Sequence, residues 1–353
     1  MVSFYPGPSR IYDEIPAYIK DAAKEGVLSM NHRSPEFEVL AKKTATLFKK
    51  KLGVPTNYTV LYTSSATECW EIIAQSLITD KSYHFFSGAF GKKWFEYTVA
   101  LNKNAEALLF SREEKIEPAD FSFPYPQATI CLTQNETSNG TQLEAGILKK
   151  FRKLNPAALI AVDATSSMAG IQLDFKQADV WFASVQKCFG LPAGLAVMIC
   201  SPRAVERAKI IQEKLHYNSF ANMVSMMEKW QTTHTPNVLG VYLLMRVLEK
   251  SDGIATIHQK TVERFQKWEA FAESNGWLKP LIENREVRSY TVLPLQAEAS
   301  VIAAVKSKAK KIGFLLGEGY GDLKATTLRI ANFPALRDRE VKALMTFLKS
   351  LKK

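Results

Sequence analysis

Residues 158–187 read ALIAVDATSSMAGIQLDFKQADVWFASVQK, and this stretch decides the fold. Two apolar runs within it, residues 158–163 and 180–184, have the length and the β-branched and aromatic content of buried strands. The first run ends on Asp163, and Lys187 follows the second run, 24 residues after the aspartate. Ligands of parallel α/β sheets bind beyond the carboxyl ends of the strands, so these two side chains are candidate site residues.

Short runs of the same kind occur on both sides of this stretch. From residue 58 onward they alternate with segments of helical spacing, which is typical of a largely parallel sheet covered by helices. One of these helices is expected to begin just after Ser65. The seven predicted strands are residues 58–63, 83–87, 107–110, 128–133, 158–163, 180–184 and 195–200.

The pattern changes near Pro236, and this change predicts a second, smaller domain. The sequence beyond it is mostly helical, and a chain of 353 residues is longer than one ordinary core needs. We expect an N-terminal segment (1–15) that packs on the small domain, a large domain (16–240) and a small α+β domain (241–353). In the latter part we expect helices at 238–249, 253–273 and 340–351 and strands at 288–295 and 327–332.

Composition excludes several classes of protein. Hydrophobic residues make up 46% of the chain and charged residues 23%, so it can bury a large core. Its longest apolar runs fall far short of the roughly 18 residues of a membrane helix. No secretory signal is visible, and the four cysteines have neither disulfide-framework nor metal-ligand spacing. We expect a cytoplasmic globular protein with no membrane partner and no metal.

The chain is basic, with 46 lysines and arginines against 35 acidic residues and a net charge of +11. Such an excess suits nucleic acid, an acidic membrane surface or an anionic small molecule. The densest basic runs, at 49–51, 149–153 and 306–311, fall on the solvent side or the end of expected amphipathic helices. We interpret them as solvated helix faces and expect no nucleic-acid partner.

Single motifs at the strand ends leave alternatives open. The hydroxyl-rich residues 64–67 could hold a phosphate on backbone N–H groups, but serine and threonine are also ordinary N-caps. Phe90 could stack on a flat ring or simply pack beneath a loop. Lys187 could form a Schiff base with an aldehyde cofactor, although a strand-end lysine alone is more often solvated.

Together and in this order, the motifs resemble those of the class V aminotransferases. This branch of the fold-type I pyridoxal-phosphate enzymes contains the phosphoserine, alanine–glyoxylate and serine–pyruvate aminotransferases, and the resemblance covers nearly the whole chain. It implies a large domain with a mostly parallel seven-stranded sheet and a smaller α+β C-terminal domain. Its landmarks are residues 4–8 (FYPGP), 32–37 (HRSPEF), 65–68 (SATE), 135–137 (NET), 162–164 (VDA), 184–187 (SVQK) and 328–330 (LRI).

The resemblance implies catalytic and cofactor-binding roles. Lys187 would carry pyridoxal 5'-phosphate as a Schiff base and move a proton between the substrate's α-carbon and the cofactor. Asp163 would keep the pyridine nitrogen protonated. Phe90, where the family usually has tryptophan, would stack on the ring, and Thr137 would hydrogen-bond its phenolic oxygen. The cofactor phosphate would be held by Ser65, Ala66, Thr67 and Gln186.

The resemblance also implies how the substrate and a partner subunit bind. Arg329 would bind the substrate's α-carboxylate in a bidentate manner. His32 and Arg33 match a loop pair that contacts the substrate's phosphate in the phosphoserine branch. His234 and Thr235 match a segment that reaches across a two-fold interface to the partner's cofactor phosphate, which implies a homodimer. Histidine replaces the family's asparagine there.

The favoured function is therefore transfer of an amino group between a small amino acid and a 2-oxo acid. O-Phospho-L-serine with 2-oxoglutarate and glutamate is the leading pair, and a serine or alanine aminotransferase using glyoxylate or pyruvate is the alternative. The phosphoserine branch has a glycine-rich phosphate turn with a second arginine nearby, and residues 64–67 replace that turn here. A cysteine desulfurase is less favoured, because no cysteine follows Cys200. A binding protein without catalysis is also less favoured.

Overall fold

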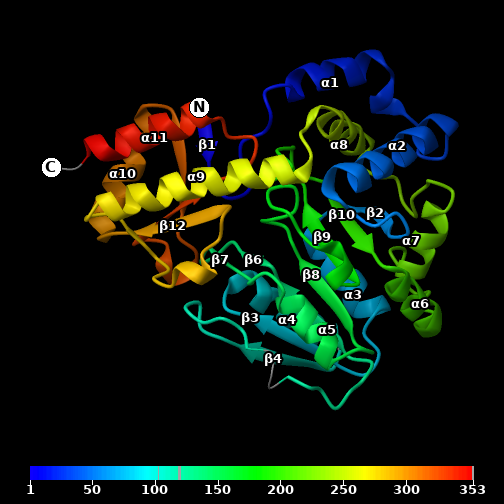
Figure 1. The fold of residues 1–353 in the computed structure, drawn as a ribbon. Helices are drawn as coiled ribbons and strands as arrows, with labels where there is room; N and C mark the ends of the chain where they lie inside the picture. Colours follow the sequence, from blue (N-terminus) through cyan, green and yellow to red (C-terminus); the bar gives the residue numbers. More distant parts are fainter. Residues whose placement is uncertain (102, 118–120, 352–353) are drawn as a thin grey trace.

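The computed structural model describes residues 1–101, 103–117 and 121–351, and its main feature is a seven-stranded sheet (Figure 1). The strand order is β2-β10-β9-β8-β5-β3-β4. Neighbours from β9 to β4 are parallel, whereas β10 is antiparallel to β9 and β2, so the predicted mostly parallel sheet is confirmed. The strands are β2 Thr59–Thr63, β3 Ser82–Phe86, β4 Ala105–Leu109, β5 Thr129–Thr133, β8 Leu159–Asp163, β9 Val180–Ser184 and β10 Ala196–Cys200.

Helices pack over this sheet, and every residue of β8, β9 and β10 is buried. This double burial explains why these strands read as continuous apolar runs rather than as alternating ones. Ser34, Ser65 and Ser201 each accept a hydrogen bond from a backbone N–H three residues ahead and so fix where α2, α3 and α6 begin. The helices of this part are α1 Ile15–Lys24, α2 Pro35–Leu52, α3 Ala66–Ser76, α4 Ala89–Ala100, α5 Ile147–Leu154, α6 Pro202–Ile211, α7 Phe220–Met227 and α8 Val238–Lys250.

A second sheet combines the two ends of the chain. Its order is β1-β13-β14-β12-β11, and β1 lies parallel to β13 although more than 300 residues separate them. Figure 1 shows the helices α9, α10 and α11 gathered around it, away from the large sheet. The elements are β1 Val2–Phe4, α9 Ile254–Ser274, β11 Lys279–Pro280, β12 Val292–Gln296, α10 Ala299–Lys311, β13 Phe314–Glu318, β14 Thr327–Ala331 and α11 Asp338–Ser350.

The structure differs from the sequence-based expectation mainly at element ends and at the edges of the second sheet. The strand expected at 288–295 begins only at Val292, because Ser289 Oγ accepts the backbone N–H groups of Thr291 and Val292 and turns the chain there. The short or half-exposed strands β1, β11 and β13 were not expected. The expected domain boundaries at residues 15 and 240 stay predictions, and residues 102, 118–120 and 352–353 of those domains lie outside the described residues. Within the described chain, no helix is long and apolar enough to cross a membrane.

Candidate active site

Lys187 lies just beyond the end of β9, and its side chain is buried. Its Nζ atom donates hydrogen bonds to Thr137 Oγ1 at 2.8 Å and to Ser166 Oγ at 2.9 Å. These two hydroxyls also form a short hydrogen bond with each other. Burial lowers the pKa of the Lys187 amine to about 8, so a substantial fraction is uncharged and nucleophilic near neutral pH.

The N-terminal segment covers Lys187. Backbone N–H of Ser9 donates to the Gln186 carbonyl at 3.0 Å, which ties the segment to the residue before the lysine. Gly7 has a φ of 140°, and a Cβ atom there would lie 2.8 Å from Lys187 Cε. This close approach requires glycine, and it explains why a motif so far from Lys187 in the sequence belongs to the same site.

Asp163 is the last residue of β8, and its side chain is buried at the cavity. It accepts hydrogen bonds from the Trp70 indole N–H at 3.2 Å and from the Thr165 backbone N–H at 2.9 Å. Burial nevertheless raises its pKa, and the Lys187 charge acts in the opposite direction. Burial disfavours the charged form of this carboxylate, so a cation that enters the site would stabilise its negative charge.

Arg329 comes from the second sheet, where it is the middle residue of β14. Its Nε donates to the Glu318 carbonyl at 2.6 Å and its Nη1 to the Thr137 carbonyl at 2.9 Å. These bonds hold the guanidinium in one orientation and use two of its five N–H groups. The remaining donors can bind a carboxylate in a bidentate manner.

These side chains share a cavity of about 280 Å³ between the two sheets. Three buried oxygen atoms in its lining have no hydrogen-bond partner among the residues that the structure describes: Thr133 Oγ1, Asn135 Oδ1 and Thr165 Oγ1. Buried polar atoms are normally satisfied, so this lining suits a polar occupant. The lining residues are Tyr5, Pro6, Gly7, Pro8, Ala66, Thr67, Trp70, Phe90, Thr133, Asn135, Thr137, Asp163, Thr165, Ser184, Gln186, Lys187, Tyr320 and Arg329.

The structure brings together most, but not all, of the residues singled out from the sequence. Ala66, Thr67, Phe90, Thr137, Asp163, Gln186, Lys187 and Arg329 line this cavity, whereas His32, Arg33, Ser65, His234 and Thr235 do not. Ser65 caps α3 by accepting the Glu68 N–H, which is the ordinary N-cap alternative. Arg33 donates to Gln231 at 2.9 Å, and burial, together with the nearby Arg33 charge, lowers the pKa of His32.

Sequence reasoning assigned no role to Trp70, Ser166 or Tyr320. Trp70 lies in the helix expected just after Ser65, and its indole N–H donates to Asp163. Ser166 belongs to the hydroxyl-rich loop after β8, a signal that could have marked it as a partner of Lys187. Tyr320 has no local sequence signal, because only the pairing of β13 with β14 brings its loop to the cavity.

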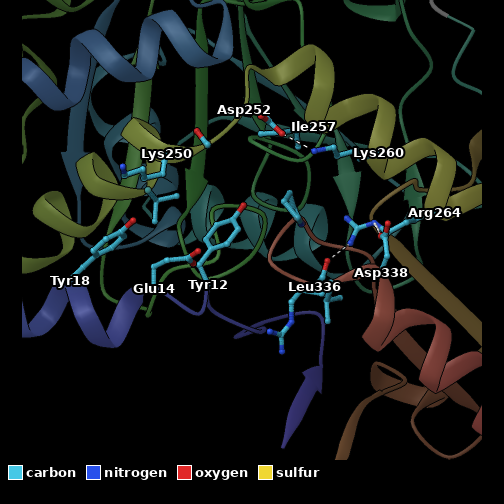
Figure 2. Close-up of a pocket in the computed structure, with 14 residues that line it drawn as sticks. Tyr12, Glu14, Tyr18, Lys250, Asp252, Ile257, Lys260, Arg264, Leu336 and Asp338 are labelled. Carbon is cyan, nitrogen blue, oxygen red and sulfur yellow. Dashed lines mark hydrogen bonds and ion pairs between the residues drawn. The ribbon is translucent and has the colours of Figure 1, made fainter.

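A second cavity, of about 450 Å³, lies between the N-terminal segment, the α8–α9 junction and the start of α11 (Figure 2). Two of its charged side chains are held within the protein: Lys260 donates to Asp252 at 2.8 Å, and Arg264 donates to the Leu336 carbonyl. Lys187 is not among its lining residues. We therefore take the Lys187 cavity as the candidate active site.

The fold is α/β, and this cavity holds a buried lysine amine together with a buried carboxylate. The family model for class-V aminotransferases matches residues 117–287. A crystal structure of a phosphoserine aminotransferase from Cytophaga hutchinsonii is 33% identical, with a TM-score of 0.94, over 100% of this chain and 99% of that one. This chain belongs to the class V aminotransferase family and is a transaminase.

Two further relatives show the breadth of the similarity. A phosphoserine aminotransferase from Nocardioides sp. is 27% identical over 97% of this chain and 92% of its own length. An alanine–glyoxylate aminotransferase from Nostoc sp. shares only 19% identity, with a TM-score of 0.82 over 100% of this chain and 95% of that one. At this identity the last similarity speaks for the fold alone.

Proposed function

We propose that this transaminase uses pyridoxal 5'-phosphate and exchanges amino groups between O-phospho-L-serine and 2-oxoglutarate. The observation that carries the proposal is the buried Lys187 amine, held by two hydroxyls and facing the buried Asp163 carboxylate. Relatives that are named phosphoserine aminotransferase, and that match this chain over nearly their full length, support the substrate pair. Serine or alanine with glyoxylate or pyruvate is the alternative, favoured by the replacement of the phosphoserine branch's glycine-rich turn at residues 64–67.

The donors around the cavity fit this cofactor. Asp163 offers a carboxylate to a protonated pyridine nitrogen, and Phe90 offers an apolar ring for stacking. Thr137 stands beside the Lys187 amine, where it can also hydrogen-bond the phenolic oxygen. Thr67, in the first turn of α3, and Gln186 line the cavity and offer donors to a phosphate. Ser65 caps the helix instead, and the Ala66 backbone N–H donates to Ser184 Oγ at 2.8 Å.

The residues of this chain would transfer the proton and orient the substrate. Pyridoxal phosphate, when bound, supplies an aldehyde and an electron-withdrawing ring, which make loss of the substrate's α-proton easier. Lys187 Nζ takes the proton from the α-carbon and later delivers it, while Thr137 and Ser166 orient the amine. Arg329 holds the α-carboxylate so that the α-carbon faces Lys187.

We also propose that the enzyme is a homodimer in which each subunit completes its partner's site. In one subunit His234 lies against the Tyr217 ring and near His32, outside the subunit's own cavity. Arg33 and His32 would meet the substrate's phosphate in the partner, and His234 and Thr235 its cofactor phosphate. Sedimentation at micromolar concentrations tests the dimer, and a monomer with full activity would contradict it.

The cytoplasm stays the expected compartment.

The purified protein is expected to show a visible absorption band of bound pyridoxal phosphate. Adding O-phospho-L-serine should bleach this band within one turnover, and 2-oxoglutarate should restore it. L-Serine, L-alanine and L-glutamate, added singly, serve as comparisons. Bleaching by L-serine or L-alanine but not by O-phospho-L-serine would favour the alternative substrates. Absence of the band after incubation with pyridoxal phosphate would contradict the cofactor assignment.

The rate of cofactor uptake by the cofactor-free protein is expected to depend on pH with a midpoint near pH 8. An ordinary lysine titrates near pH 10.4, but burial lowers the pKa of Lys187 to about 8. Only the neutral amine attacks an aldehyde, so uptake should rise about tenfold per pH unit below this midpoint and level off above it. Stopped-flow absorption between pH 6 and 10 measures the profile. A rate that still rises steeply between pH 9 and 10 would contradict the lowered pKa.

A further inference from the structure

A lysine outside the predicted site reaches the candidate active site through a tyrosine. Lys93 lies in α4, and its Nζ donates a hydrogen bond of 2.6 Å to the hydroxyl of Tyr320. Tyr320 lies between β13 and β14 and lines the Lys187 cavity. This contact therefore joins the large sheet's layer to the second sheet at the edge of the cavity.

The geometry places Lys93 and Lys187 around one aromatic ring. Lys187 Nζ is 5.2 Å from the centroid of the Phe90 ring and Lys93 Nζ is 5.9 Å from it. The two nitrogen atoms are therefore no farther apart than the sum of these distances. Lys93 does not itself line the cavity and meets its edge through Tyr320, so its ammonium would act on the outer end of a substrate whose α-amino group lies at Lys187.

Arg329 completes the arrangement. Its guanidinium carbon is 5.6 Å from the centroid of the Tyr320 ring, and Lys93 Nζ is 5.4 Å from the same centroid. Arginine and lysine thus flank one ring, each able to hold one anionic group of a substrate that carries two. The hydrogen bond to Tyr320 raises the pKa of Lys93, which keeps the ammonium charged.

We propose that Lys93, positioned by Tyr320, binds the acidic group on the substrate's side chain together with the partner's His32 and Arg33, and so contributes to specificity. The proposal rests on the proposed function, because it takes Arg329 as the site of the α-carboxylate. A lysine ammonium is a point charge that accepts phosphate or carboxylate without a fixed geometry. The same residue would therefore serve O-phospho-L-serine in one half-reaction and 2-oxoglutarate in the other.

The proposal predicts a change in specificity for a Lys93→Met variant of the cofactor-loaded enzyme. Methionine keeps an unbranched side chain but removes the charge. The half-saturating concentrations of O-phospho-L-serine and L-glutamate, measured from single-turnover bleaching of the cofactor band, should rise about tenfold or more. The value for L-alanine, which has no acidic side-chain group, should stay within about twofold.

Lys92→Met is the matched control, since Lys92 is the preceding residue of α4, and its amine lies 3.6 Å from a Glu96 oxygen. It should leave all three substrates unchanged, and Lys93→Arg should restore most of the affinity for the acidic ones. An equal loss for alanine, no loss for the acidic substrates, or the same loss in Lys92→Met would overturn the proposal.

The wild-type enzyme separates failure of this proposal from failure of the proposed function. Bleaching of the wild-type band by alanine but by neither acidic amino acid would leave a transaminase and refute the role of Lys93. A wild-type protein whose cofactor band responds to no amino acid would refute the proposed function and, with it, the role of Lys93. If the wild-type enzyme responds normally to acidic substrates and Lys93→Met responds equally well, the role of Lys93 is refuted and the proposed function stands.

Discussion

A Lys187→Ala variant is expected to lose transamination almost completely, with kcat falling by at least about 10⁴-fold. The substitution removes both the amine that holds the cofactor and the group that moves the α-proton. These two losses act on the same steps, so the effect exceeds that of removing a single positioning contact. Turnover with O-phospho-L-serine and 2-oxoglutarate measures kcat, and the absorption spectrum reports how the cofactor is bound.

The fold should tolerate this substitution, because Thr137 and Ser166 still form a hydrogen bond with each other once the amine is gone. Lys176→Ala, at an exposed lysine beyond β8, is the matched control and should keep full activity. Added methylamine should restore a small part of the proton transfer in Lys187→Ala and none in a misfolded protein. Retention of more than about a tenth of the wild-type kcat would exclude Lys187 from the chemistry.

The large sheet and the cavity's central pair could be predicted because their signals are local. The strands β8 and β9 are apolar runs of the right length. The first ends on Asp163, and Lys187 follows the second within three residues. Burial on both faces makes such runs conspicuous in the sequence. The carboxyl ends of parallel neighbours meet at one edge, so two separate motifs suffice to place one site.

The contacts that complete the site could not be predicted, since they join distant parts of the chain. Gly7 approaches Lys187 only because β1 pairs with β13, and Tyr320 reaches the cavity only through the loop between β13 and β14. Strand pairing at such separations has no periodicity in the sequence. The sequence likewise does not show where His32 and Arg33 lie relative to the cavity, and in the structure neither residue lines it.

An Asp163→Asn variant is expected to keep the cofactor but to turn over about 10² to 10³-fold more slowly. Asparagine has the shape of aspartate, and its amide oxygen can keep one of the two hydrogen bonds that Asp163 accepts, from Trp70 on Oδ2 and from the backbone N–H of Thr165 on Oδ1. Its amide nitrogen cannot accept the other. It lacks the negative charge that would keep the pyridine nitrogen protonated, so the ring withdraws electrons less strongly when the α-proton leaves. Single-turnover rates with O-phospho-L-serine measure the loss.

Stability distinguishes this electrostatic effect from a folding defect. Burial raises the pKa of Asp163, which means that enclosing its charge costs free energy in the cofactor-free protein. A neutral asparagine avoids that cost, which offsets the loss of one accepted hydrogen bond, so cofactor-free Asp163→Asn should melt near the wild-type temperature. Asp322→Asn, at an exposed position, should change neither rate nor melting. A near-normal rate in Asp163→Asn would mean that the buried carboxylate does not act on the cofactor ring, whereas a slow variant of wild-type stability would assign it that role.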